Sequence, residues 1–515
     1  MKRFLLLLLL VVGLSGFALP KDKKLTILYT NDLHSHLEPH IVPWVSKTRK
    51  VGGFANIATL VKKEKASNNH TVYFDAGDFF SGPYVSSLTK GEAVIDAMNY
   101  LGLDAVAAGN HEFDHNWKNA QTQFAKADFP ILAGNLFVKE TGKLVWDNPY
   151  IIKKVNGIRL GIIGLHGKFA FYDTTAAEMI EGIEARDEEV YLRKYIKELE
   201  GKTDLIVLLI HQGIPGTQSS GGTGDVQRNH KKDIELAQNV RGIDIMVTGH
   251  PHSGTPEPII SNGTIIVSTD AYTIELGKLE LKYNKKKDKI TSYKNHYGYL
   301  FDDEVADDPQ MLTVIDRWKK KLAVITEEVV TESTTALTRS YSEESLLGNM
   351  VADAMMHAYP DYDFAVTNSG GLRQDIDKGP VTVGELISAF PFPNTVVQLE
   401  MKGSDVRKMF EHGAGLTNGI LQASKQIEMT YDESKPIGAR VVTCRISGRS
   451  LDDKKTYKVL TSNFLADGGD GFSMFKKASS YKNTGFGLLD SMIKYMKTFK
   501  KYDPKVDGRV KKTIS

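Results

Sequence analysis

The chain has 515 residues, of which 41% are hydrophobic and 25% charged, as in an ordinary soluble globular protein of several domains. Lysine and arginine total 65 against 63 aspartates and glutamates, so the formal net charge of +2 excludes a protein drawn to nucleic acid or acidic lipid by its overall field. The single cysteine excludes an intrachain disulfide and any metal site built from several thiolates. A bound metal ion would need histidine, aspartate, glutamate or asparagine ligands.

Residues 1–20 have the pattern of a secretory signal peptide. Lys2 and Arg3 precede an apolar run over 4–12, and small residues follow it, so cleavage is expected near Ala18. The run is shorter than the ~20 apolar residues that span a bilayer, which disfavours the alternative of an uncleaved anchor. We therefore expect an exported protein, periplasmic or secreted, with no stable membrane insertion after cleavage. Export without disulfides favours a bacterial envelope.

Apolar runs alternate with amphipathic stretches through the first half of the mature chain. Strands are predicted at 25–30, 71–75, 104–108, 131–133, 158–165, 205–210 and 243–248. Helices are predicted between them at 54–65, 92–101 and 188–199. This alternation indicates an α/β domain, which we place at 21–306.

A helix at 307–331 is predicted to link this domain to a second one. Asp308 followed by Pro309 is a typical helix start. One apolar stripe follows at helical spacing, made of Met311, Ile315, Trp318, Leu322 and Ile325. An ordinary surface helix of the first domain is the alternative. A second α/β domain is expected at 332–515, with a helix at 346–357 and a strand at 364–368.

Polar side chains follow five of the predicted strands, at the carboxyl ends where open α/β sheets bind ligands. They are Asp32, His34, Asp78, Asn110, His211, His250 and His252. Oxygen and imidazole ligands suit Zn²⁺, Mn²⁺, Fe or Co²⁺, and seven of them suit two ions. Two ions about 4 Å apart stabilise the attacking and leaving oxygens of an in-line displacement, so the pattern predicts phosphoester hydrolysis. For any one histidine alone, a structural role is the alternative.

His111 and Asp114 follow Asn110 at a spacing that allows the carboxylate to orient the imidazole. Such a pair could stabilise the transition state or protonate the leaving oxygen, so we interpret it as a catalytic dyad. The alternative is that His111 is a metal ligand and Asp114 a helix cap.

The motifs at the strand ends resemble those of a known family. They are Tyr29-Thr-Asn-Asp-Leu-His-Ser-His36, Asp75-Ala-Gly-Asp78, Gly109-Asn-His-Glu-Phe-Asp114 and Gly249-His-Pro-His252. Together they resemble the calcineurin-like metallophosphoesterases, and more narrowly the secreted 5′-nucleotidase family. That family includes UDP-sugar hydrolase, 2′,3′-cyclic-nucleotide phosphodiesterase and ecto-5′-nucleotidase. The resemblance covers nearly the whole mature chain.

The resemblance implies a four-layer αββα metallophosphoesterase domain followed by a C-terminal α/β nucleoside-binding domain. It implies one metal site made of Asp32, His34, Asp78 and His252. It implies a second metal site made of Asp78, Asn110, His211 and His250. His111 and Asp114 match the catalytic dyad of the family.

The second half of the chain also matches the family. Asn368-Ser-Gly-Gly-Leu-Arg373 is similar to the family's Asn-x-Gly-Gly-x-Arg, which implies that Asn368 and Arg373 bind substrate. The resemblance implies that Phe392 and Phe464 sandwich the base and that Asp470 binds the ribose hydroxyls. From composition alone, two phenylalanines of the core would be the alternative.

One position departs from the family pattern. Many members carry a second arginine clamp shortly before the Leu-Gly-Asn at 347–349, and Tyr341 stands where some of them have it. Arg339 lies two residues earlier, and we take it as the candidate for this clamp.

These observations predict an exported enzyme with two divalent metal ions that cleaves nucleoside 5′-monophosphates to nucleoside and phosphate. The expected partner is a small nucleotide and not a nucleic acid polymer, and the sequence leaves the oligomeric state open. Alternatives are a 2′,3′-cyclic-nucleotide phosphodiesterase, a hydrolase of UDP-sugars or nucleotide diphosphates, a sulfur-compound hydrolase, or a non-catalytic secreted binding protein.

Overall fold

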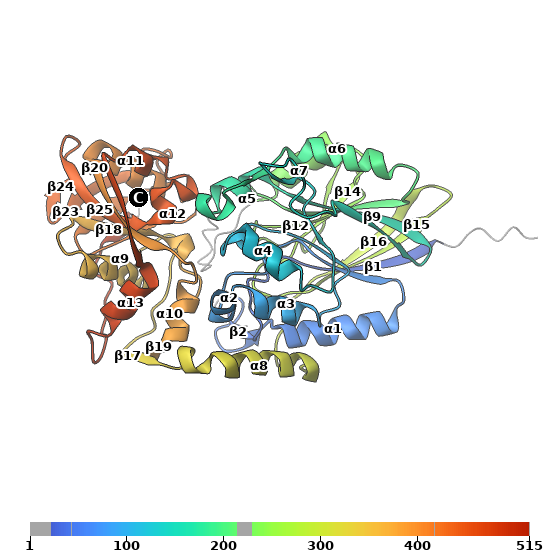
Figure 1. Cartoon of the computed structure of the whole chain (residues 1–515), viewed down its shortest axis with the longest axis horizontal. Coiled ribbons are helices and arrows are strands. Elements are labelled where there is room, and N and C mark those ends of the chain that lie inside the picture. Colours follow the sequence, from blue (N-terminus) through green and yellow to red (C-terminus); the bar gives the residue numbers. More distant parts are fainter. Residues whose placement is uncertain (1–21, 43, 214–228, 417, 514–515) are drawn as a thin grey trace, which may run out of the picture.

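The computed structural model describes residues 22–42, 44–213, 229–416 and 418–513. The predicted signal peptide lies outside these ranges. The molecule has two lobes along its long axis (Figure 1). The N-terminal lobe contains most of the first half of the chain, and the C-terminal lobe contains the end of the chain. Among the described residues, no helix is both long enough and apolar enough to cross a membrane.

Two six-stranded sheets form the centre of the N-terminal lobe. The order in the first is β16 (Lys289–His296), β15 (Gly277–Asn284), β1 (Lys23–Thr30), β4 (Thr71–Asp75), β5 (Ala105–Ala107) and β6 (Ile131–Leu132). The order in the second is β13 (Ile259–Ser261), β14 (Thr264–Val267), β12 (Ile245–Gly249), β11 (Leu205–His211), β9 (Ile158–His166) and β8 (Tyr150–Val155). The central strands β1, β4, β5 and β6 are parallel, as are β9, β11, β12 and β14.

The two sheets face one another across a buried core, and helices cover their outer faces. Leu25 of β1 and Leu160 of β9 lie in the core between the sheets, whereas Leu28 and Ile163 of the same strands pack under the helices. The first sheet is covered by α1 (Phe54–Ser67) and α3 (Glu92–Met98), and the second by α6 (Glu188–Leu199) and α7 (Lys231–Asn239). The central parallel strands are buried on both faces and are mostly apolar, as in β4, β9 and β11. The predicted four-layer αββα fold is confirmed.

The C-terminal lobe is built on a five-stranded sheet with helices on both faces. Its order is β21 (Leu421–Ala423), β18 (Phe364–Asn368), β25 (Thr456–Ser462), β20 (Thr395–Lys402) and β26 (Ser480–Gly487). One face is covered by α9 (Leu346–Ala358), α10 (Val383–Ala389) and α13 (Leu488–Met496), and the other by α11 (Gly403–Ala414). A four-stranded sheet packs on the core that lies on the α11 side of the five-stranded sheet. Its order is β24 (Arg449–Ser450), β23 (Val441–Ile446), β22 (Ile427–Tyr431) and β27 (Val510–Lys512).

Short elements complete the fold. They are the ribbons β2 (His40–Ile41) with β3 (Lys50–Val51), β7 (Leu136–Val138) with β10 (Ile183–Ala185), and β17 (Val329–Ser333) with β19 (Gly379–Thr382). The short helices are α2 (Tyr84–Thr89), α4 (Trp117–Phe124), α5 (Lys168–Asp173) and α12 (Asn463–Ala466).

The helix predicted to link the lobes is α8 (Pro309–Thr326). The Asp308 side chain accepts from the backbone N–H groups of Gln310 and Met311, which confirms the predicted cap. The apolar stripe of α8 packs into the core between the first sheet and its covering helices in the N-terminal lobe. Ile325 was wrongly assigned to this stripe: it is 49% exposed, because the stripe drifts past the last turn and Thr326 takes the buried position.

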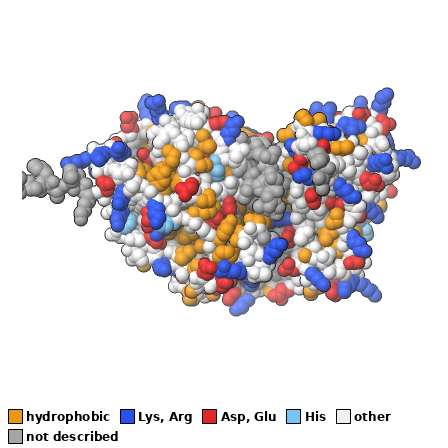
Figure 2. Space-filling view, turned by 180° about the vertical axis from the view of Figure 1, so that it is seen from behind, with side chains coloured by type: hydrophobic (Ala, Val, Ile, Leu, Met, Phe, Trp, Pro, Cys, Tyr) orange, Lys and Arg blue, Asp and Glu red, His pale blue; other side chains and the backbone are white. Residues whose placement is uncertain are grey.

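The lobes meet through α2 and α10 and through a contact beside α12. The Tyr84 backbone N–H donates to Ser388 Oγ at 2.9 Å, and Ser87 Oγ donates to the Pro391 carbonyl at 2.7 Å. Asn463 Nδ2 donates to Glu178 Oε1 at 2.8 Å. Seen from behind, side chains of both charges are scattered over the visible face (Figure 2), as the small net charge implies.

Candidate active site

The seven predicted metal ligands meet at the carboxyl ends of β1, β4, β5, β11 and β12. Each of these residues is 6% exposed or less. Those in the left-handed backbone region are Asp32, His34, Asp78, His250 and His252, with φ between 44° and 86°. Such backbone is uncommon outside glycine and costs about 1 kcal/mol or more per residue, and it clusters at functional sites. The tight turns direct side chains from the edges of both six-stranded sheets to one point.

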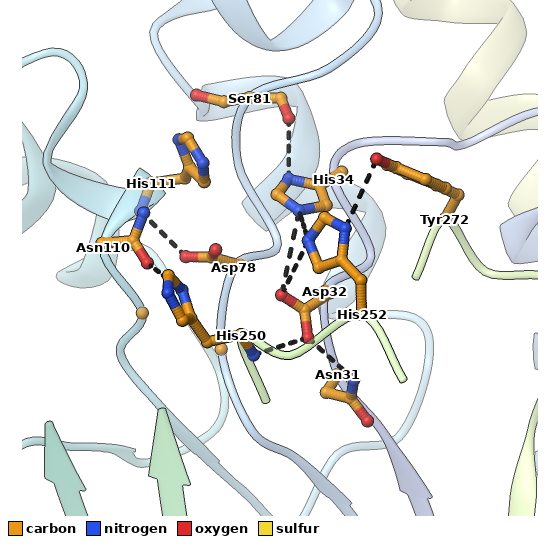
Figure 3. Close-up of polar contacts among 12 residues, drawn as sticks. Asn31, Asp32, His34, Asp78, Ser81, Asn110, His111, His250, His252 and Tyr272 are labelled. Carbon is orange, nitrogen blue, oxygen red and sulfur yellow. Dashed lines mark hydrogen bonds and ion pairs between the residues drawn. The ribbon is translucent and has the colours of Figure 1, made fainter. Parts of the chain in front are cut away.

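Asp32, His34 and His252 form the first cluster (Figure 3). The two histidine Nε2 atoms lie 2.9 Å apart, and Asp32 Oδ1 lies 3.3 Å from His252 Nε2. Asp32 Oδ2 accepts from the Asn31 side chain and the His250 backbone N–H, whereas the buried Oδ1 has no hydrogen-bond partner among the described residues. An unpartnered buried carboxylate oxygen is costly unless a cation binds it.

The tautomer of His34 also suits a ligand. Its Nδ1 lies 3.0 Å from the Ser81 carbonyl, to which it donates, so a neutral ring keeps its lone pair on Nε2. Burial, and next the Arg373 guanidinium, hold the pKa of His34 well below its usual value. The neutral ring is the form that binds a metal.

Asp78, His211 and His250 form a second cluster, with Asn110 beside it. Asp78 Oδ1 accepts from the His111 backbone N–H at 2.8 Å, and Oδ2 lies 3.0 Å from His211 Nε2. His250 Nδ1 lies 2.9 Å from Asn110 Oδ1 (Figure 3). His211 Nδ1 donates to the Ala76 carbonyl at 2.8 Å, which leaves Nε2 directed at Asp78.

The charges of this cluster are strongly coupled. Burial opposes ionisation of Asp78, but His211 and His111 hold the pKa of its carboxyl well below the usual range. Burial would lower the pKa of His211, yet Asp78 and Asp32 raise it to about 9. A proton on His211 therefore occupies the place that a divalent cation would take between the same carboxylates.

The predicted dyad forms a hydrogen bond at the edge of the two clusters. His111 Nδ1 lies 2.7 Å from Asp114 Oδ2. His111, His34 and Asp78 could also surround a cation. The bond to Asp114 commits Nδ1, so we interpret His111 as an oriented imidazole.

One cavity joins these residues to the C-terminal lobe. Its lining includes Asp78, Asn110, His111, Asp114, His250, His252, Asn368, Arg373, Phe392, Phe464 and Asp470. Arg373 Nη2 lies 3.3 Å from His34 Nε2, and the Phe392 ring stacks on His111 with centroids 5.7 Å apart. Asp470 Oδ2 accepts from Asn368 Nδ2 at 2.7 Å, and Oδ1 accepts from Asn418 Nδ2 at 2.8 Å.

Arg339 contacts the backbone of the Arg373 turn and does not form part of the cavity lining. Its Nη1 donates to the carbonyls of Leu372 and Arg373, and its backbone N–H donates to Asp375. It is not among the described residues that line the cavity, whereas Tyr341 is. In this arrangement Arg339 holds the turn that carries Arg373.

Glu112 is a further residue of the site, beyond the predicted ligands and dyad. Its buried carboxyl group accepts from the backbone N–H groups of Asp78, Phe79, Phe80 and Gly109. Burial and the charge of Asp78 raise its pKa to about 8, although the four N–H donors favour the carboxylate. It joins the ligand turns after β4 and β5. Its place inside the Gly109–Asp114 motif was the available signal.

Comparisons with known proteins agree with this geometry. The calcineurin-like phosphoesterase family matches residues 25–254, and the 5′-nucleotidase C-terminal domain matches residues 322–477. The chain is 30% identical to the snake venom 5′-nucleotidase of Gloydius brevicauda, covering 95% of this chain and 88% of that protein. It is 28% identical to the trifunctional nucleotide phosphoesterase protein YfkN of Bacillus subtilis (strain 168), over 96% of this chain but only 35% of that longer protein.

A solved structure shares the fold over nearly the whole chain. The 5′-nucleotidase precursor from Thermus thermophilus superposes with a TM-score of 0.83 at 27% identity, covering 95% of this chain and 99% of that one. The chain belongs to the 5′-nucleotidase family of calcineurin-like metallophosphoesterases, a family of metal-dependent phosphoester hydrolases.

Proposed function

We propose that this protein hydrolyses nucleoside 5′-monophosphates to nucleoside and phosphate with two divalent metal ions. The observation that carries the proposal is the shared cavity: the metal-ligand clusters form one end, and Phe392, Phe464 and Asp470 form the other. A substrate with a phosphate at one end and a nucleoside at the other matches this order.

The residues present fit two metal ions. Asp32, His34, Asp78 and His252 would hold one, and Asp78, Asn110, His211 and His250 the other. The buried Asp32 Oδ1, for which the described part of the chain supplies no hydrogen-bond donor, supports this assignment. Divalent ions bound there would polarise the phosphoryl oxygens and lower the pKa of the attacking water. Zn²⁺, Mn²⁺, Fe and Co²⁺ suit this ligand set.

The remaining residues bind the substrate and move one proton. Arg373, beside His34, would bind the phosphate oxygens, as a planar guanidinium does well. His111, oriented through Nδ1 by Asp114, would neutralise charge at the phosphoryl group and give its Nε2 proton to the leaving 5′-oxygen. Phe392 and Phe464 would stack on the base, and Asp470 would accept from the ribose hydroxyls. Arg339 would act through the Arg373 turn.

We further propose an exported protein with a signal peptide at 1–20, a metallophosphoesterase domain at 21–306, a linking helix at 307–331 and a nucleoside-binding domain at 332–515. The names of its relatives support export, since they include venom and precursor proteins.

Phosphate release from a panel of esters tests the function. The mature protein with Mn²⁺ or Zn²⁺ is given AMP, ATP, UDP-glucose and 2′,3′-cyclic AMP, with Asp78→Asn as control. We expect AMP to be hydrolysed fastest and all turnover to be lost in the control. Faster turnover of another ester would identify that ester as the preferred substrate and leave the proposed metal chemistry unchanged. No metal-dependent turnover of any ester would favour a binding protein.

A further inference from the structure

Ser81 lies between the first metal-ligand cluster and the dyad, and the function proposed above gives it no role. It is 2% exposed. Its Oγ donates to Asp114 Oδ2 at 2.5 Å. Its carbonyl accepts from His34 Nδ1 at 3.0 Å, as Figure 3 shows. One residue therefore contacts both a predicted metal ligand and the carboxylate of the predicted dyad.

The oxygen to which Ser81 donates is the one that holds the histidine. Asp114 Oδ2 accepts from His111 Nδ1 at 2.7 Å as well as from Ser81 Oγ. Hydrogen bonds to a carboxylate are short and strong. Two donors on one oxygen fix the rotation of the carboxylate about its last bond, and that rotation sets the direction of the imidazole.

The backbone leaves Ser81 little freedom to move. Its φ is 58°, in the left-handed region, which is unfavourable for serine and is tolerated where the surroundings hold it. Its N–H donates to the buried Ser86 Oγ at 3.1 Å. At the next residue, Gly82, a Cβ would lie 1.9 Å from the His34 carbonyl oxygen, so the turn lies directly against the ligand loop.

We propose that Ser81 is a positioning residue that fixes the His111–Asp114 pair relative to the metal centre. It touches no reacting atom and acts through Asp114. The turn that carries it is anchored to His34, so the dyad keeps its place relative to the ligand loop. This role rests on the proposed function, because it requires that His111 takes part in hydrolysis.

A double-mutant cycle tests the role. Ser81→Ala should lower kcat for AMP about tenfold or more and leave KM and the bound metal content within about twofold of wild type. In an Asp114→Ala background the same change should lower kcat less than about twofold, because the carboxylate through which Ser81 acts is absent. Equal losses in both backgrounds would overturn the proposal.

Two further variants separate positioning from folding. Ser81→Gly also lacks the hydroxyl but adopts positive φ readily, so it should show the same loss of kcat; wild-type kcat would overturn the proposal. Ser35→Ala is the matched control. Ser35 is fully buried, and its Oγ donates to the Phe79 carbonyl of the turn that carries Ser81 and not to Asp114. It should stay within about threefold of wild type, and a loss equal to that of Ser81→Ala would count against positioning.

The activity of the wild-type protein distinguishes a failure of the proposed function from a failure of the role of Ser81. A wild type that hydrolyses no phosphoester overturns the proposed function and this role together. An active wild type with additive losses in the cycle overturns the role of Ser81 alone.

Discussion

The two ends of the cavity are built differently. At the metal end, the side chains come from turns at the ends of strands in both sheets of the N-terminal lobe. Asp32 and Asp78 each have one oxygen fixed by N–H donors and the other directed at the centre. At the nucleoside end, Phe392 and Phe464 are only partly buried, and Asp470 is held by two amides from separate segments. Rigid placement suits charge stabilisation in a transition state, and partly exposed rings suit a substrate that enters and leaves.

Under the proposed function, the chemistry belongs to the N-terminal lobe and the choice of substrate to the C-terminal lobe. Changes at the metal end should abolish turnover of every phosphoester. Changes at the nucleoside end should alter only the reaction with nucleotides.

The largest effect is expected from Asp78→Asn. Asp78 is shared by the two proposed metal sites and faces His211 at 3.0 Å. The change should lower kcat about 1,000-fold for AMP and for p-nitrophenyl phosphate alike, with loss of bound metal. Steady-state kinetics and elemental analysis of the purified variant measure both. Retention of full metal content and activity would show that Asp78 is not a metal ligand.

A smaller effect at the same end is expected from Glu112→Gln. An amide in place of the carboxylate turns an N–H₂ group toward at least one of four backbone donors. The ligand turns should loosen, and metal affinity should fall about 10-fold to 100-fold, as for other groups that orient metal ligands. Titration of the metal-free protein with Mn²⁺ gives the affinity. Unchanged affinity would show that the turns hold without Glu112.

Phe464→Ala should separate the two ends. The loss of one stacking ring should raise KM for AMP about 10-fold or more, since stacking contributes ~1–3 kcal/mol per base. The KM for ribose 5-phosphate, which carries no base, should change less than about twofold. Equal losses with both substrates would mean that Phe464 supports the site structurally.

The smallest effect is expected from Asp470→Asn. Its carboxylate is proposed to accept from the ribose hydroxyls, so KM for AMP should rise up to about tenfold. The 2′,3′-dideoxy analogue of AMP lacks those hydroxyls and should be affected less. A matched loss with both nucleotides would point to disruption of the bonds to Asn368 and Asn418 instead.

The sequence was most informative where the chemistry and the local structure coincide. Residues placed directly after apolar strands were expected to gather at strand ends, and they do, although they come from two sheets and not from one. The alternation of strands and helices predicted an α/β domain, and the family resemblance implied its four-layer arrangement. The bonds of Ser81 and Glu112 were not predictable, because their partners are brought together only by the packed turns. Ile325 was misassigned because the buried side of α8 shifts around the helix by its last turn, where Thr326 is buried and Ile325 is half exposed. The contacts of Arg339 depend on how the carbonyl groups of Leu372 and Arg373 point, and the local sequence does not show this.

The most direct test of the shared cavity is kcat/KM of the wild-type protein for AMP and for ribose 5-phosphate in the same Mn²⁺ assay. Both carry the same 5′-phosphate, and only AMP carries a base. We predict a preference for AMP of about tenfold or more, because the two rings stack only on a base. Equal kcat/KM values would contradict the assignment of substrate choice to the C-terminal lobe.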